Sequence, residues 1–290
     1  MDALHKILIL GHSGFIGKSL YNYFKTNINF LIFGASSNEC NLLDLVSVTN
    51  YFSTIEGPIH IIICSVINKH LCNNSESLHK NIEMIDNLLS CAKQKDIRSI
   101  IYLSSVDVYG QNPQLPINEK TLINPLNIYG LSKFSCEFLL RESNLDFPVT
   151  ILRLPGVYGK GDNLKSIVGL FVKKIYYDNQ ITLFDEGKIL RDYLEINDLC
   201  HIIKKLIVKP GSLTLNIATG NSLALKDIAN IIIDKISKRI HVEYIKNSTN
   251  SAMNLVFDNS ALINQFPELR LTDINTGCEL YINNFIKNKK

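Results

Sequence analysis

A glycine-rich turn near the start of the chain restricts its fold more than any other feature. An apolar run, KILIL (6–10), is followed at once by GHSGFIG and then by a stretch of helical character. This order places Gly11, Gly14 and Gly17 in a tight turn between a strand and a helix. The first glycine permits the turn, the second lets a pyrophosphate approach the backbone, and the third lets the helix pack closely on the strand. Because the helix N-terminus also offers free N–H groups to phosphates, the turn predicts a dinucleotide-binding site.

Apolar runs typical of buried strands alternate with helical patterns through the first half of the chain. The expected strands span residues 6–10, 29–33, 59–65, 98–105 and 148–156. The expected helices span 14–25, 78–95 and 125–143, with a short strand end and then a helix within 42–55. This alternation predicts an α/β fold, a Rossmann-type doubly wound parallel sheet with helices on both faces. After Gly156 the pattern loosens. We therefore expect a dinucleotide-binding domain over 1–156 and a smaller substrate-binding lobe over 157–290, parts of which pack back on the first domain.

Composition argues against several classes of partner. The net charge is +3 and no dense block of Lys and Arg appears before the final NKK, so nucleic acid is not an expected partner. Apolar runs stay below the ~18 residues of a membrane span, and the N-terminal apolar stretch is too short for a secretory signal. Seven dispersed cysteines, without a CxxC pair, are typical of a reduced cytoplasmic protein without disulfides or a zinc site.

A second short stretch, NIYGLSK (127–133), carries a tyrosine and a lysine four positions apart. On a helix, Tyr129 and Lys133 share one face, and an ammonium near a phenol favours the phenolate. Such a tyrosine can exchange a proton near neutral pH. Ser104 and Ser105 end an expected strand, and parallel sheets place ligand sites at the carboxyl ends of their strands. We therefore expect Ser105, Tyr129 and Lys133 to converge on the same crevice as the glycine turn.

Taken together, these motifs resemble the extended short-chain dehydrogenase/reductase family, in its NAD-dependent epimerase/dehydratase branch. The resemblance covers most of the chain. The matching segments, in order, are GHSGFIG, LLDL, IIICS, KNIEMIDNLLSCAK, SSVDVYG, YGLSK, LRLPGVYGKGD, LRDYLEINDL and NIATGNSLALKDIANII. It implies an enzyme that acts on a nucleotide-linked sugar, with hydride transfer between C4 of the hexose and a nicotinamide.

The resemblance also implies roles for individual residues. Ser105, Tyr129 and Lys133 are the implied catalytic residues. Cofactor contacts fall on Gly11, Gly14, Phe15, Ile16, Gly17, Ser36, Asp44, Leu45, Cys64, Ser65, Asn81, Tyr129, Lys133 and Pro155. Substrate contacts fall on Asp107, Asn163, Leu164 and Arg191, and no residue is assigned to a metal. Homodimerisation through the Tyr129 helix and the preceding helix is a further expectation from the resemblance.

Three departures from the family pattern narrow the choice of reaction and of cofactor. The 4,6-dehydratases use Thr-Asp-Glu where this chain has Ser105-Val106-Asp107, so a dehydratase is disfavoured. Gly156 stands where many members have an Asn that touches the phosphates of the sugar nucleotide, and Asn163 and Leu164 are the candidates to replace it.

Two reactions remain open. One is reduction of an NDP-4-keto-6-deoxyhexose at C4 with Tyr129 as proton donor. The other is an NDP-hexose 4-epimerase, similar to UDP-glucose 4-epimerase, with tightly bound NAD. A non-catalytic NADP-binding regulator is a remote third reading.

The third departure concerns the cofactor. NAD-preferring members carry an acid at the end of the second strand, where it binds the ribose 2′-hydroxyl. Here Gly34, Ala35, Ser36 and Ser37 stand in that place, and no Arg lies nearby to bind a 2′-phosphate. The missing acid favours NADP over NAD. The segment is similar to that of GDP-fucose synthase-like reductases, which share a GH-x-G turn and a following NLLD.

Overall fold

The computed structural model describes residues 4–67, 74–246 and 253–287. The chain divides into two compact units that are interleaved along the sequence. The first unit is formed by Met1–Pro113, Leu122–Arg153 and Cys200–Leu215. The second is formed by Gln114–Thr121, Leu154–Leu199 and Asn216–Lys290. The sequence predicted a boundary at residue 156, with parts of the later chain packing back on the first domain. The later segment 200–215 belongs to the first unit.

A six-stranded sheet forms the centre of the first unit. Its strands are β1 (His5–Leu10), β2 (Phe30–Ala35), β3 (Ile59–Ile63), β4 (Ile97–Ser105), β5 (Val149–Leu154) and β10 (Leu213–Asn216). They lie in the order β10-β5-β4-β3-β1-β2, and β1 pairs in parallel with both β2 and β3. The order therefore reverses between β1 and β3, which is the point where open α/β sheets bind ligands. The α/β Rossmann-type fold predicted from the sequence is confirmed.

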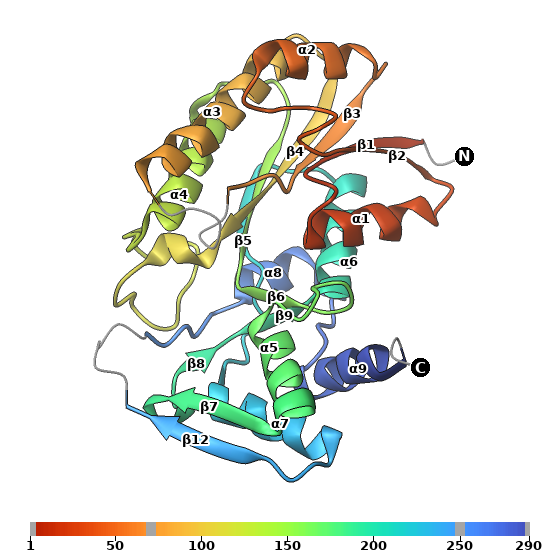
Figure 1. Cartoon of the computed structure of the whole chain (residues 1–290). Helices are drawn as coiled ribbons and strands as arrows, with labels where there is room; N and C mark the ends of the chain where they lie inside the picture. Colours follow the sequence, from red (N-terminus) through yellow and green to blue (C-terminus); the bar gives the residue numbers. More distant parts are fainter. Residues whose placement is uncertain (1–3, 68–73, 247–252, 288–290) are drawn as a thin grey trace. The chain divides into compact units, whose positions relative to one another are not determined.

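Helices cover both faces of this sheet (Figure 1). On one face lie α2 (Leu45–Ser53), α3 (Ser75–Ala92) and α4 (Ile128–Glu142), and on the other lie α1 (Phe15–Lys25) and α6 (Ile196–Val208). The side chains of β1 alternate between the faces. Leu8 and Leu10 belong to the apolar core with Val48 and Phe52 of α2, whereas Ile7 points the other way and is also fully buried. Burial on both faces explains why the strands read as continuous apolar runs.

Side-chain caps decide where two of these helices begin. The Asn127 side chain accepts a hydrogen bond from the Gly130 N–H at 2.8 Å, so α4 starts at Ile128 and not directly after Pro125 as the sequence suggested. The Asp44 carboxylate accepts from the Val46 N–H at 3.0 Å and caps α2. The short strand end expected within 42–55 is not formed: residues 42 and 43 are a turn that leads into the Asp44 cap, and the helix follows.

The second unit is built from short strand pairs and helices. The pairs are β6 (Gly156–Tyr158) with β9 (Tyr193–Glu195), β7 (Gln180–Phe184) with β12 (His241–Ile245), and β8 (Leu190–Arg191) with β11 (Leu223–Ala224). The helices are α5 (Ile167–Lys173), α7 (Leu225–Ile236), α8 (Ser260–Gln265) and α9 (Ile274–Lys287). Short helical turns η1 (Val106–Tyr109), η2 (Lys174–Asp178) and η3 (Asp185–Gly187) complete the described elements. An apolar core joins α5, α7 and α9 through Val168, Ile228 and Cys278.

Candidate active site

The glycine turn after β1 has the geometry that a phosphate-binding loop requires. Gly11 has φ +83°, and a Cβ there would lie 2.8 Å from the Ser65 backbone nitrogen. A Cβ on Gly17 would lie 2.3 Å from the Gly11 carbonyl oxygen, so this glycine lets α1 pack against the turn. Around Gly14, by contrast, an added Cβ would meet only the Gly11 oxygen at 3.5 Å. The backbone at Gly14 is therefore open to a ligand at the start of α1.

A cavity of about 320 Å³ adjoins this turn at the reversal point of the sheet. Its lining comes from the glycine turn, the loop after β2, the loop after β3 and one residue of α3. The lining residues are Gly11, Ser13, Gly14, Ser37, Cys40, Asn41, Leu42, Leu43, Cys64, Ser65, Val66, Ile67 and Met84. The cavity, the open backbone at Gly14 and the free N-terminus of α1 fit a dinucleotide. Four of the expected cofactor residues, Gly11, Gly14, Cys64 and Ser65, line it.

Other expected cofactor residues lie at the edge of the cavity or support it. Phe15 and Ile16 open the first turn of α1, where backbone N–H groups are unpaired within the helix. The Asn81 side chain is buried and bonds both polar groups of the Ile67 backbone, at 2.8 and 3.1 Å. It therefore fixes the loop after β3. Ser36 is held by a neighbouring carboxylate, since its N–H donates to Glu39 at 2.7 Å.

Three further residues of the expected cofactor set do not line the cavity. The Asp44 carboxylate is engaged as the cap of α2, and the next residue, Leu45, is 45% exposed. Pro155 belongs to the second unit. A direct contact of Asp44 with adenine therefore stays a prediction from the family resemblance.

The structure brings the three expected catalytic residues together. Ser105 ends β4, and its hydroxyl accepts a hydrogen bond from the Asp107 N–H at 3.1 Å. A hydrogen bond also joins the side chains of Ser105 and Tyr129. Lys133 is buried, its Nζ donates to the Leu103 carbonyl at 2.6 Å, and Nζ lies 5.8 Å from the Tyr129 ring centroid. The end of β4 and one face of α4 thus bring together the Ser105 hydroxyl, the Tyr129 phenol and the Lys133 amine.

The pKa of Tyr129 differs from the expectation based on spacing alone. Burial, followed by the nearby Asp107 carboxylate, raises the pKa of Tyr129, and the hydrogen bond to Ser105 opposes this rise. Burial lowers the pKa of Lys133 to about 8. The lysine was expected to lower the pKa of the phenol, but burial and Asp107 raise it in this structure. Tyr129 therefore holds its proton at neutral pH.

A buried ion pair behind Ser105 was not found from the sequence. Arg153 on β5 donates to the Glu137 carboxylate at 2.7 Å through Nη2 and 3.1 Å through Nε, and both side chains are at most 2% exposed. Arg153 Nη1 donates to the Tyr109 hydroxyl at 3.0 Å, and Ser104 Oγ donates to Glu137 at 2.5 Å. Because Ser104 directly precedes Ser105, the network fixes the end of β4 against α4 and β5.

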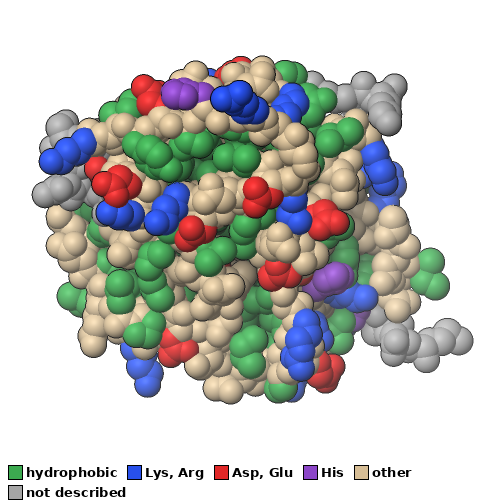
Figure 2. Space-filling model, turned by 90° about the horizontal axis from the view of Figure 1, so that it is seen from below, with side chains coloured by type: hydrophobic (Ala, Val, Ile, Leu, Met, Phe, Trp, Pro, Cys, Tyr) green, Lys and Arg blue, Asp and Glu red, His purple; other side chains and the backbone are tan. Residues whose placement is uncertain are grey.

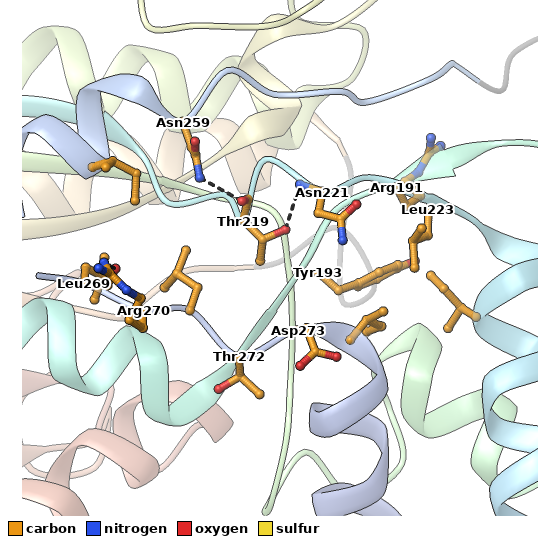
Figure 3. Close-up of a pocket in the computed structure, with 14 residues that line it drawn as sticks. Arg191, Tyr193, Thr219, Asn221, Leu223, Asn259, Leu269, Arg270, Thr272 and Asp273 are labelled. Carbon is orange, nitrogen blue, oxygen red and sulfur yellow. Dashed lines mark hydrogen bonds between the residues drawn. The ribbon is translucent and has the colours of Figure 1, made fainter. Parts of the chain in front are cut away.

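The expected substrate residues fall in both units. Asp107 lies in the first unit beside Ser105. In the second unit, Arg191 lines a cavity of about 390 Å³ (Figure 3). Its Nη1 donates to the carbonyls of Leu190, at 2.9 Å, and Met253. Asn163 and Leu164, with φ of 55° and 59°, form the turn that leads to α5 and do not line this cavity.

The described residues offer neither a metal cluster nor a membrane-spanning helix. Within 4–67, 74–246 and 253–287, no group of three or more His, Cys, Asp or Glu side chains is placed to hold a metal. In the same part of the chain, no helix has the length and apolar character needed to cross a bilayer. Figure 2 shows basic and acidic side chains interspersed on the face in view.

Comparison with protein families gives a match over most of the chain. The model of the NAD dependent epimerase/dehydratase family matches residues 7–218, which include the glycine turn and the three residues gathered at β4 and α4. The chain belongs to this family. Its relatives are nucleotide-sugar epimerases, dehydratases and synthases, so the chain is an NAD(P)-dependent nucleotide-sugar enzyme of the extended short-chain dehydrogenase/reductase type.

Two relatives and one solved structure illustrate the range of this group. GDP-6-deoxy-D-talose 4-dehydrogenase from Aggregatibacter actinomycetemcomitans is 28% identical over 79% of this chain and 79% of its own length. GDP-L-colitose synthase from Yersinia pseudotuberculosis is 24% identical over 96% of this chain and 98% of its own. The structure of UDP-glucose 4-epimerase from Thermotoga maritima, solved with UDP-glucose, superposes with a TM-score of 0.89 at 18% identity, covering 98% of this chain and 100% of that one. Solved structures with this fold hold either NAD or NADPH.

Proposed function

We propose that the protein reduces a nucleotide-linked 4-keto-6-deoxyhexose at C4. A nicotinamide dinucleotide held by the glycine turn and the cavity beside it would, in its reduced form, supply the hydride for C4. Tyr129 donates the proton to the C4 oxygen, and Ser105 donates a hydrogen bond to the same oxygen. Lys133 holds positive charge near the phenol, which stabilises the phenolate left after proton transfer.

The grouping of Ser105, Tyr129 and Lys133 at the end of β4 is the observation that carries this proposal. A reductase needs a proton donor and a hydrogen-bond donor at the C4 oxygen and a positive charge near the phenol, and these three side chains supply them. The Val106 side chain is 5% exposed and apolar, where the dehydratases place the acid that protonates a leaving hydroxyl. Loss of water from C5 and C6 is therefore not supported.

Relatives support C4 of a 6-deoxy sugar as the reacting centre. One is named for oxidation at C4 of GDP-6-deoxy-D-talose, which is the reverse of a C4 reduction. The synthase of GDP-L-colitose aligns over nearly the whole of both chains. The T. maritima epimerase supports the fold, because its identity of 18% is too low to transfer a reaction.

The experiment that tests the reaction compares the wild type with Tyr129→Phe. The wild type is expected to oxidise NADH or NADPH when given a nucleotide-linked 4-keto-6-deoxyhexose. Tyr129→Phe is expected to lose about 10²-fold or more in kcat while its affinity for the reduced cofactor stays within about threefold. Near-stoichiometric NAD carried through purification, together with interconversion of 4-hydroxy epimers and no net cofactor oxidation, would establish the epimerase instead. Equal activity of the two proteins would support a binding role.

We also propose that the protein forms a homodimer through α3 and α4. Leu131 and Phe138 lie seven residues apart on α4, which places them on one face, and they are 39% and 53% exposed. Apolar side chains repeated at this spacing on a surface helix are typical of a helix-packing interface.

A further inference from the structure

The end of β2 is the place where this fold distinguishes NAD from NADP, and here its surroundings are unusual. A Cβ added to Gly34 would lie 2.7 Å from Cγ of His12, because the imidazole of the glycine turn lies over this position. An acidic side chain at Gly34 would therefore collide with His12. A carboxylate near this point would therefore have to come from another part of the chain.

Glu39 brings a carboxylate to this place. Its Oε2 accepts the Ser36 N–H at 2.7 Å, directly after β2, and lies 3.8 Å from Nδ1 of His12. Ser36 in turn accepts the N–H groups of Glu39, at 3.1 Å, and of Cys40, at 2.9 Å. The segment 36–40 is thus a single turn, closed by the Glu39 carboxylate on the Ser36 N–H and by two backbone N–H groups on the Ser36 carbonyl. Glu39 therefore lies between the end of β2 and the glycine turn, the two elements that flank the adenosine ribose in dinucleotide-binding folds.

The charge of Glu39 is retained and accessible. The side chain is half exposed, and hydrogen bonds from the Ser36 backbone and side chain hold the pKa of the carboxylate below its ordinary value. The same bonds occupy the Ser36 N–H and hydroxyl, which would otherwise be placed to donate to a 2′-phosphate.

We propose that Glu39 makes this protein prefer NAD(H) over NADP(H). This inference rests on the dinucleotide-dependent function proposed above. A carboxylate can accept the hydrogen bond of a ribose 2′-hydroxyl, whereas it repels the two negative charges of a 2′-phosphate. The preference for NADP that the sequence suggested depended on the absence of an acid at the end of β2. The fold brings the carboxylate of Glu39, five residues beyond Gly34, to that place.

The test is a binding measurement that does not need the sugar substrate. Fluorescence of bound NADH and NADPH gives the dissociation constants for the wild type, Glu39→Gln, Glu39→Lys and a control, Glu56→Gln. Gln keeps an oxygen that can accept the Ser36 N–H, so the turn is expected to stay closed. Glu56 is an exposed acid that precedes β3, at the opposite edge of the sheet from the glycine turn.

The wild type is expected to bind NADH on the order of tenfold more tightly than NADPH, and Glu39→Gln is expected to remove most of that difference by strengthening NADPH binding. Glu39→Lys should reverse the preference, and Glu56→Gln should leave the ratio unchanged. Tighter binding of NADPH by the wild type, or an equal change in both constants in Glu39→Gln, would overturn the role of Glu39. If neither nucleotide binds, the dinucleotide site and the proposed function fail together with it.

Discussion

Removal of the Glu137 carboxylate is the perturbation whose cost the structure defines best. In Glu137→Gln, Arg153, which is 2% exposed, loses its counter-charge, and the amide has one oxygen left to accept from the guanidinium where the carboxylate has two, at 2.7 and 3.1 Å. Breaking one partner of a buried ion pair costs about 3–5 kcal/mol, because the remaining charge is not solvated. For a chain of this size, that corresponds to a fall in Tm of roughly 5–15 °C.

Thermal unfolding followed by circular dichroism, with urea unfolding as a second measure, gives this loss directly. Glu142→Gln is the matched control, since it removes an exposed acid from the same helix and should change stability by less than about 0.5 kcal/mol. The double substitution Glu137→Leu with Arg153→Met should recover most of the loss, because an apolar pair of similar volume replaces both charges. A Glu137→Gln protein as stable as the control would refute the reasoning that an uncompensated Arg153 is left in the core.

Two further predictions concern the first unit. Burial lowers the pKa of His60 to about 4, and this imidazole bonds His5 at 3.1 Å and Ser99 at 2.8 Å. Because His60 in the unfolded chain binds a proton near pH 6.5, the free energy of unfolding should fall by about 3 kcal/mol as the pH drops from 6.5 to 4. His60→Gln should reduce this pH dependence, as measured by urea unfolding at each pH. Phe138→Glu should place a charge in the proposed dimer interface and shift the mass measured by light scattering from dimer to monomer, whereas a monomeric wild type would contradict the interface.

The parts of the site that sequence analysis located are those defined by local spacing. Gly11, Gly14 and Gly17 lie within one turn, and Tyr129 and Lys133 lie within one turn of a helix, so local geometry alone sets the spacing within each group. The Ser105 hydroxyl lies next to Tyr129 because β4 ends where the first turns of α4 pass.

The parts that sequence analysis missed depend on contacts between distant segments. Arg153 meets Glu137 only because β5 and α4 pack together, and neither residue has a local pattern that predicts the other. Glu39 likewise reaches His12 through the turn after β2, so a search for an acid at the strand end did not find it. The sequence showed that the acid was absent from the strand end, but only the folded turn shows that the Glu39 carboxylate lies next to that place.

The interleaving of the two units limits how this protein can be divided. A fragment that ends at residue 156 would lack β10, which lies beside β5 in the sheet, and the portion of α6 that belongs to the first unit. Its outer strand would then offer unpaired backbone groups to other chains and favour aggregation. An exchange of substrate specificity between relatives therefore has to transfer segments 114–121, 154–199 and 216–290 together, while residues 200–215 stay with the parent scaffold.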